Sequence, residues 1–139
     1  MRKALLILLL LSSSAVAQER KIDFAPVLKD AYDRDFEPAC VRVDETDRTK
    51  CAEKVQPTLG FICVSSLGSS LESDKNEDYR KKLDRDDLAR RIATSERTKQ
   101  PVSLQSEDIV LLKERIGKTW PNATLVGAAI RQLELGNSR

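Results

Sequence analysis

The sequence predicts one α+β domain, mostly α, in which a short N-terminal β-hairpin is followed by about four helices ending in an αα-hairpin. Apolar residues alternate in the segment 39–43, which favours a strand, and farther along the chain they recur at helical spacing. The 139 residues are rich in charge and poor in aromatic side chains, at 33% and 4%. This composition is typical of a small helical domain with a thin core.

The first 17 residues have the order of a secretory signal peptide. Two basic residues precede an apolar run over residues 4–11, and small residues follow up to Ala17. The run is well short of the ~20 apolar residues that a transmembrane helix needs. We therefore expect cleavage after Ala17, and a single exported domain of residues 18–139, periplasmic or secreted, without stable membrane insertion. An uncleaved membrane anchor is the alternative.

Loss of this segment changes the charge of the protein. Arg2 and Lys3 carry the whole formal excess of +2, so the remaining chain has as many acidic as basic residues. A surface of mixed sign and no net charge exerts no long-range attraction on nucleic acid or anionic lipid. We expect neither as a partner.

Two extended segments are expected before the first helix. Apolar residues alternate in residues 21–29, where a proline removes a backbone donor, so this segment is expected to form an edge strand or a bent one. A hairpin centred between Glu45 and Thr46 would place Cys40 directly opposite Cys51. Cross-strand neighbours lie within reach of a disulfide. We expect this bond because export leads to an oxidising compartment.

Cys63 is the third cysteine of the chain. Its helical spacing from Leu59 and Leu67 places it on an apolar face, which favours a buried free thiol over a reactive one. Pairing of Cys51 with Cys63 is the alternative connectivity.

The first two helices are expected between residues 58 and 94. Thr58 is suited to cap a helix whose apolar residues recur up to Leu67 and which ends at Gly68. The polar residues that follow, up to Asn76, are predicted to form a mobile loop. Residues 77–94 are good helix formers without a narrow apolar stripe, so we expect one helix with a wide contact face.

The last two helices are predicted to form an αα-hairpin joined by residues 117–121. A connection over residues 98–104 precedes the first of them, with Ser103 or Ser106 as its cap. Asn122 is suited to cap the second, which Gly136 ends. The buried stripe of the first is expected to consist of Ile109, Leu112, Ile116 and Trp120.

No residue set in the chain points to catalysis. Histidine is absent, which removes the usual general base at neutral pH and the commonest metal ligand. Phosphate loops and nucleophile elbows are missing as well. We therefore predict no enzyme, no catalytic residues, no cofactor and no metal site. A candidate interaction surface is formed by Arg80, Arg85 and Trp120.

Three segments resemble small phage- or prophage-encoded proteins of unassigned function. They are PTLG at residues 57–60, LARRI at 88–92, and VLLKERIGK at 110–118 with VG at 126–127. The resemblance spans roughly residues 21–133 and implies no catalytic residues.

The sequence thus predicts an exported binding or interaction protein, of phage or prophage derivation, whose partner is another protein. Two further hypotheses stand beside it. One is a small envelope hydrolase that depends on carboxylates; the other is an inhibitor of phage lysis or of superinfection.

Overall fold

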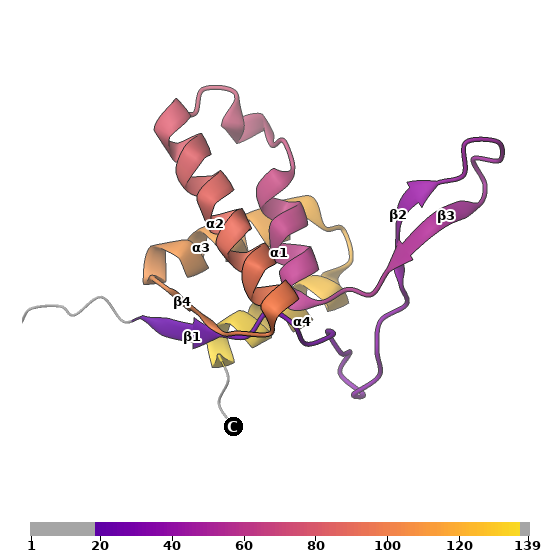
Figure 1. Cartoon of the computed structure of the whole chain (residues 1–139), viewed down its shortest axis with the longest axis horizontal. Coiled ribbons are helices and arrows are strands. Elements are labelled where there is room, and N and C mark those ends of the chain that lie inside the picture. Colours follow the sequence, from indigo (N-terminus) through magenta and orange to yellow (C-terminus); the bar gives the residue numbers. More distant parts are fainter. Residues whose placement is uncertain (1–18, 137–139) are drawn as a thin grey trace, which may run out of the picture.

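The computed structural model describes residues 19–136, so the predicted signal peptide and its cleavage site at Ala17 lie outside the described residues. Within them the fold is α+β and mostly α, as predicted (Figure 1). The strands are β1 (Arg20–Ile22), β2 (Ala39–Val43), β3 (Cys51–Val55) and β4 (Val102–Leu104). The helices are α1 (Leu59–Gly68), α2 (Tyr79–Thr98), α3 (Ser106–Thr119) and α4 (Ala123–Leu135), with a short 3-10 turn, η1 (Glu72–Asp74), between α1 and α2.

Helix α1 begins and ends where the sequence predicts. The Thr58 hydroxyl accepts a hydrogen bond from the backbone N–H of Phe61 at 3.0 Å, which satisfies one free donor of the first turn. Cys63 lies on the buried face of this helix. A Cβ atom at Gly60 would stand 2.6 Å from the Glu96 carboxylate of α2, so glycine permits the close approach of the two helices.

Helix α2 is continuous, as predicted, but the prediction of a wide contact face is wrong. Its buried residues are Leu88, Ile92 and Ser95. Tyr79 and Leu83 are 65% and 56% exposed. The reason is that only one side of α2 packs on the body, and Tyr79 and Leu83 fall on the opposite side of the helix.

Helices α3 and α4 form the predicted αα-hairpin. Asn122 caps α4, since its side-chain oxygen accepts hydrogen bonds from two backbone N–H groups of the first turn. The prediction of a serine cap for α3 is wrong. Its cap is Gln105, whose backbone N–H donates to the Asp108 carboxylate at 3.2 Å.

Strand β4 lies in the segment predicted to be a plain connection. It pairs antiparallel with β1, with Lys21 opposite Ser103, and so joins the start of the described chain to the segment between α2 and α3. Ile22 of β1 and Leu104 of β4 are buried. This small sheet completes the helical body, whose core is formed by Ile22, Phe24, Leu28, Leu59, Ile62, Cys63, Leu67, Leu88, Ile92, Leu104, Ile109, Leu112, Ile116, Leu125, Ala129 and Leu133.

Candidate interaction surface

Residues 39–55, called the arm below, form a β-hairpin that reaches away from the helical body (Figure 1). Strands β2 and β3 pair with each other, and every residue of both is exposed or only partly buried. An isolated two-stranded hairpin is marginally stable in water at best. The arm therefore depends on local devices rather than on a core.

The first of these devices is the predicted disulfide between Cys40 and Cys51, whose Cα atoms are 5.8 Å apart. The predicted pairing of the strands is wrong, however. Val43 lies opposite Cys51 and Cys40 opposite Lys54, because the connection spans residues 44–50 and is centred on Asp47 rather than between Glu45 and Thr46. The bond thus joins positions that are not direct partners in the ladder.

Cys63 does not take part in a disulfide, so the alternative pairing with Cys51 is absent. Its thiol lies in the core of the body. Burial raises its pKa, and the nearby negative charge of Glu96 raises it further. A thiol held neutral in this way is a poor nucleophile.

The turn of the arm is held by two aspartates. The Asp44 carboxylate accepts hydrogen bonds from the backbone N–H groups of Thr46 and Asp47, at 2.8 and 3.0 Å. Asp47 does the same for Thr49 at 3.0 Å. Hydrogen bonds from the threonine hydroxyls and from these backbone groups hold the pKa of both carboxyls below the usual value. Aspartate commonly fixes turns by this type of bond.

Two apolar side chains of the arm are exposed to solvent. Val41 is 44% exposed and Val43 is 53% exposed, both on β2. Between them Arg42 forms an ion pair with Glu53 across the hairpin, at 3.4 Å. The arm thus presents apolar groups on a backbone fixed by a covalent bond and by its turn.

The structure does not gather Arg80, Arg85 and Trp120 into one exposed surface. Arg80 is exposed in the first turn of α2. The Arg85 side chain is only 14% exposed and donates to Asp74 at 3.1 Å and to Glu77 at 2.7 Å. Trp120 is partly buried and donates from its indole nitrogen to the Ser66 hydroxyl at 3.0 Å.

Arg115 connects the surroundings of Arg85 and Trp120. It is 3% exposed, and its guanidinium donates to both Asp74 carboxylate oxygens, at 2.9 and 3.1 Å. It also donates to the backbone carbonyls of Ser66, at 2.9 Å, and of Ser69. The hydrogen bond from Arg115, together with one from a backbone N–H, holds the pKa of the Asp74 carboxyl far below its usual value.

This Arg115 network fastens the segment between α1 and α2 to α3. The sequence predicts a mobile loop there, whereas the structure places the 3-10 turn η1 in it and ties Asp74 to two arginines. The signal in the sequence was Arg115 itself. It stands three positions after Leu112 and next to Ile116, so a charge falls on the apolar stripe of α3.

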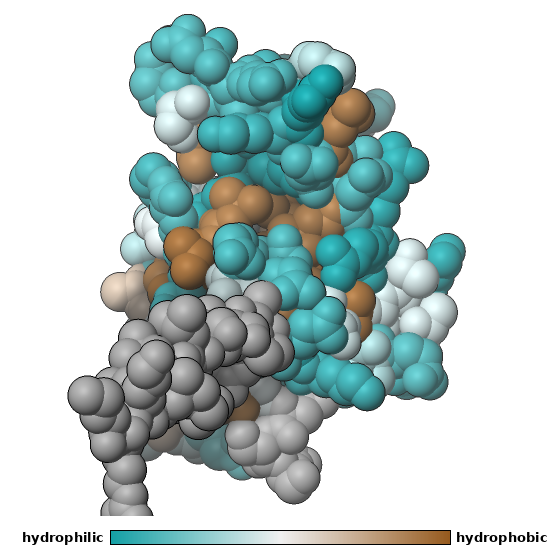
Figure 2. All heavy atoms as spheres, turned by 90° about the vertical axis from the view of Figure 1, so that its left-hand side faces the viewer, coloured by the Kyte–Doolittle hydropathy of each residue, from teal (hydrophilic) through white to brown (hydrophobic). Residues whose placement is uncertain are grey.

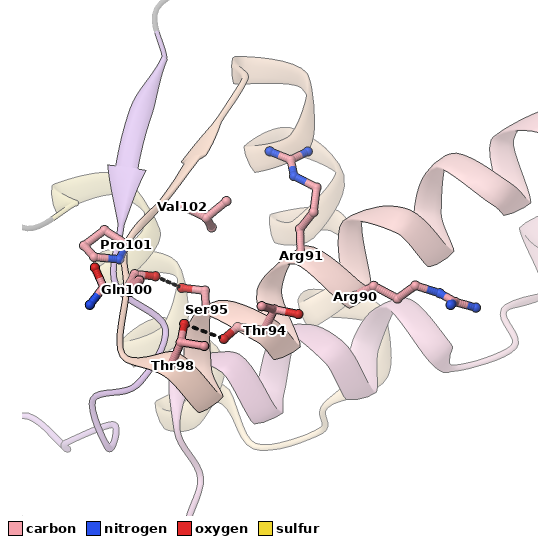
Figure 3. Close-up of a pocket in the computed structure, with 8 residues that line it drawn as sticks. All are labelled: Arg90, Arg91, Thr94, Ser95, Thr98, Gln100, Pro101 and Val102. Atoms are coloured by element: carbon pink, nitrogen blue, oxygen red, sulfur yellow. Dashed lines mark hydrogen bonds between the residues drawn. The ribbon is translucent and has the colours of Figure 1, made fainter.

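A shallow hollow of about 400 Å³ lies between the C-terminal part of α2 and the segment leading into β4 (Figure 3). Figure 3 shows the guanidinium of Arg90 pointing away from it. The hydroxyls of Ser95 and Thr98 donate to backbone carbonyls within the protein. The hollow therefore lacks the converging polar groups that an anion or substrate site needs.

The face at the left of Figure 1 carries an apolar band at mid-height beneath a hydrophilic upper part (Figure 2). Val110 of α3 is a valine on the helical body that is exposed, as Val41 and Val43 are on the arm. It serves below as a control position.

Over residues 19–136, no helix is long and apolar enough to cross a membrane, and no group of three or more acidic or cysteine side chains is placed to hold a metal ion. No protein family, curated protein or solved structure matches the chain.

Proposed function

We propose that this chain is a small exported binding protein, which works in the periplasm or outside the cell by contacting another protein through its arm. The observation that carries the proposal is the exposed arm, which is fixed by a disulfide and packs on no core. A segment held rigid without contributing to the hydrophobic core costs little to order on binding, because its backbone is already fixed.

The chemistry of the arm favours a protein partner. Residues 39–55 contain four basic and four acidic side chains, so the arm has no net charge with which to attract a polyanion. Val41 and Val43 offer apolar contact, and both outer edges of the two-stranded sheet are free of further strands in the described chain. Exposed strand edges and apolar side chains are both features that proteins recognise in one another.

The alternative of a carboxylate-dependent hydrolase receives less support. Such an enzyme needs a pair of acids in a pocket, one of them with a raised pKa. Every described carboxyl group with a shifted pKa has a lowered one, because each accepts hydrogen bonds or faces a cation. The described carboxylates are thus suited to structural contacts.

The test is affinity capture from periplasmic extract at physiological salt. The bait is the chain beginning at residue 18, with a Val41→Asp/Val43→Asp variant and a control with Val110→Asp on α3. We expect the original and the control to retain the same partner and the arm variant to lose it. Equal capture by the arm variant, or no partner for any bait across several growth conditions, would contradict the proposal.

Export is tested separately by mass spectrometry of the protein recovered from the periplasm. Cleavage after Ala17 gives a chain that begins at Gln18. An intact N-terminus found in the membrane fraction would instead indicate an anchor. If export is confirmed, unchanged lysis timing and plating efficiency of phage on expressing cells would exclude the narrower hypothesis of a lysis or superinfection inhibitor.

A further inference from the structure

Helix α2 carries a second exposed surface, which the arm does not involve. Leu88, Ile92 and Ser95 face the body, and a stripe on the opposite side of the helix is exposed along its whole length. Successive members of this stripe are four or three positions apart, which is the spacing of a helix–helix seam. The α2 stripe consists of Tyr79, Leu83, Asp86, Arg90, Ala93 and Arg97.

We propose that the α2 stripe pairs with the α2 stripe of a second copy of this chain, in antiparallel orientation about a twofold axis. The intervals between successive stripe residues are the same from either end of the helix. In an antiparallel pair, each stripe residue therefore lies opposite a different stripe residue of the second copy. Tyr79 then meets Arg97, Leu83 meets Ala93, and Asp86 meets Arg90, each contact occurring twice. A twofold interface requires this kind of self-complementarity.

Charge complementarity is the main support for a second copy as the occupant. Asp86 and Arg90 already form an ion pair within the helix, at 2.8 Å, and both side chains are well exposed. In the dimer two such pairs face each other with opposite charges adjacent. Arg97 opposite the Tyr79 ring is a cation–π pair, and Leu83 opposite Ala93 excludes water between them.

The hollow beside α2 gives the pairing an anchor. Thr94, Thr98, Pro101 and Val102 are among the residues that line it (Figure 3). Thr98 directly follows Arg97, the position that Tyr79 of the second copy reaches. Its lining is largely apolar, with the Val102 side chain directed into it. A phenol ring has an apolar body and a polar tip, so it can bury the former there and keep the latter in water.

The dimer is expected to be weak. A helix of 20 residues is about 30 Å long, and one helix per copy offers less than the ~800 Å² per partner of a standard interface. Asp87 also lies beside the α2 stripe, near the twofold axis. There it approaches Asp87 of the second copy, and the repulsion between the two carboxylates opposes association. We therefore expect a reversible monomer–dimer equilibrium whose affinity falls as salt rises.

The experiment is sedimentation velocity of the chain beginning at residue 18, over a wide concentration range and at two salt concentrations. We compare Arg90→Asp, which presents acids at both central positions, with Asp86→Arg, which presents bases at both. Each variant alone is expected to associate at least tenfold more weakly, and an equimolar mixture to associate at least as well as the original. Circular dichroism checks that all variants are folded.

Two controls assign the effect to the α2 stripe. Arg48→Asp reverses an exposed charge in the turn of the arm and is expected to leave association unchanged. Tyr79→Ala is expected to weaken it without changing its salt dependence. A chain that stays monomeric at every concentration, a mixture no better than its components, or equal association of all variants would each overturn the proposal. The arm variant Val41→Asp/Val43→Asp is expected to associate normally, so this proposal and the proposed function fail separately.

Discussion

The helical body and the arm reach a fixed conformation by different means. In the body, apolar residues from all four helices and from the β1–β4 sheet share one core, and the Arg115 network ties the segment before α2 to α3. In the arm, one disulfide, two aspartate-held turns and one cross-strand ion pair act within 17 residues. The body is fixed by contacts between distant parts of the sequence, and the arm by contacts between near neighbours.

This difference indicates which region has side chains available to contact another protein. Side chains of the body that carry charge and are buried already have partners, as Arg85 and Arg115 do. The arm leaves its valines and strand edges uncommitted while its backbone is held. If this division is right, substitutions at the buried contacts of the body should change stability, and substitutions in the arm should change binding of the partner protein.

The largest effect is expected from Arg115→Met, which keeps much of the side-chain volume but removes the guanidinium. Asp74 and the carbonyls of Ser66 and Ser69 then lose a buried donor. Breaking a buried charged contact on one side costs about 3 kcal/mol of unfolding free energy. Urea unfolding measures it, with the exposed Arg90→Met as the control, and a loss no greater than that of the control would contradict the role given to Arg115.

A smaller effect is expected from Gly60→Ala, at the close approach of α1 and α2. The new Cβ would lie 2.6 Å from the Glu96 carboxylate and would displace it from the Thr58 hydroxyl. Overpacking of this kind lowers the free energy of unfolding by about 1–3 kcal/mol. The higher helix propensity of alanine offsets part of this loss. Gly68→Ala at the other end of α1 meets nothing within 4 Å, so its midpoint in urea should stay equal or rise. Equal behaviour of the two variants would show that the helices are not close-packed at Gly60.

Acid should weaken the body through Asp74. The fold lowers the pKa of this carboxyl below its value in the unfolded chain, so the folded state binds fewer protons. The stabilisation is therefore complete above the unfolded pKa of about 4 and is lost as pH falls toward the folded pKa. Unfolding in urea at a series of pH values measures this effect. The free energy of unfolding should fall less in acid for Asp74→Asn than for the original protein. The exposed substitution Asp87→Asn is the control and should retain the full loss.

The smallest effect on the body is expected from opening the arm with Cys40→Ser/Cys51→Ser. A disulfide closing a loop of this length contributes roughly 2–3 kcal/mol to the element it ties. Since the arm is not part of the core, we expect the main unfolding transition to move by less than about 1 kcal/mol, while proteolysis within residues 39–55 becomes much faster. A large shift of the main transition would show that arm and body are one cooperative unit.

Much of the fold could be predicted from local patterns. The Thr58 cap, the stripe of α1 with Cys63 on it, and the αα-hairpin all depend on residues within one or two turns of each other. The Cys40–Cys51 bond could also be predicted, since only a short connection separates the two strands. The register of the strands could not, because the place of the turn is set by the hydrogen bonds of Asp44 and Asp47, which the alternation of apolar side chains does not report.

Features that depend on distant residues were missed. Strand β4 is three residues long and exists because β1 lies beside it. The partners of Arg115 lie 41 to 49 positions away, so the loop before α2 reads as unattached in the sequence. For the candidate site, the sequence analysis predicted an interaction surface of Arg80, Arg85 and Trp120 from their residue types alone. They gave no sign that Val41 and Val43 would remain exposed, since strand alternation normally indicates a buried face.

The pairing of β1 with β4 also sets a time order for folding. Lys21 and Ser103 are 82 positions apart, so at about 5–20 residues per second a ribosome completes β4 roughly 4–16 s after β1. During that interval Ile22 and Phe24 have no β4 strand or later helices to cover them. The core of the body therefore cannot close around β1 until the segments that follow α2 have been made, so the nascent chain stays open over most of its synthesis.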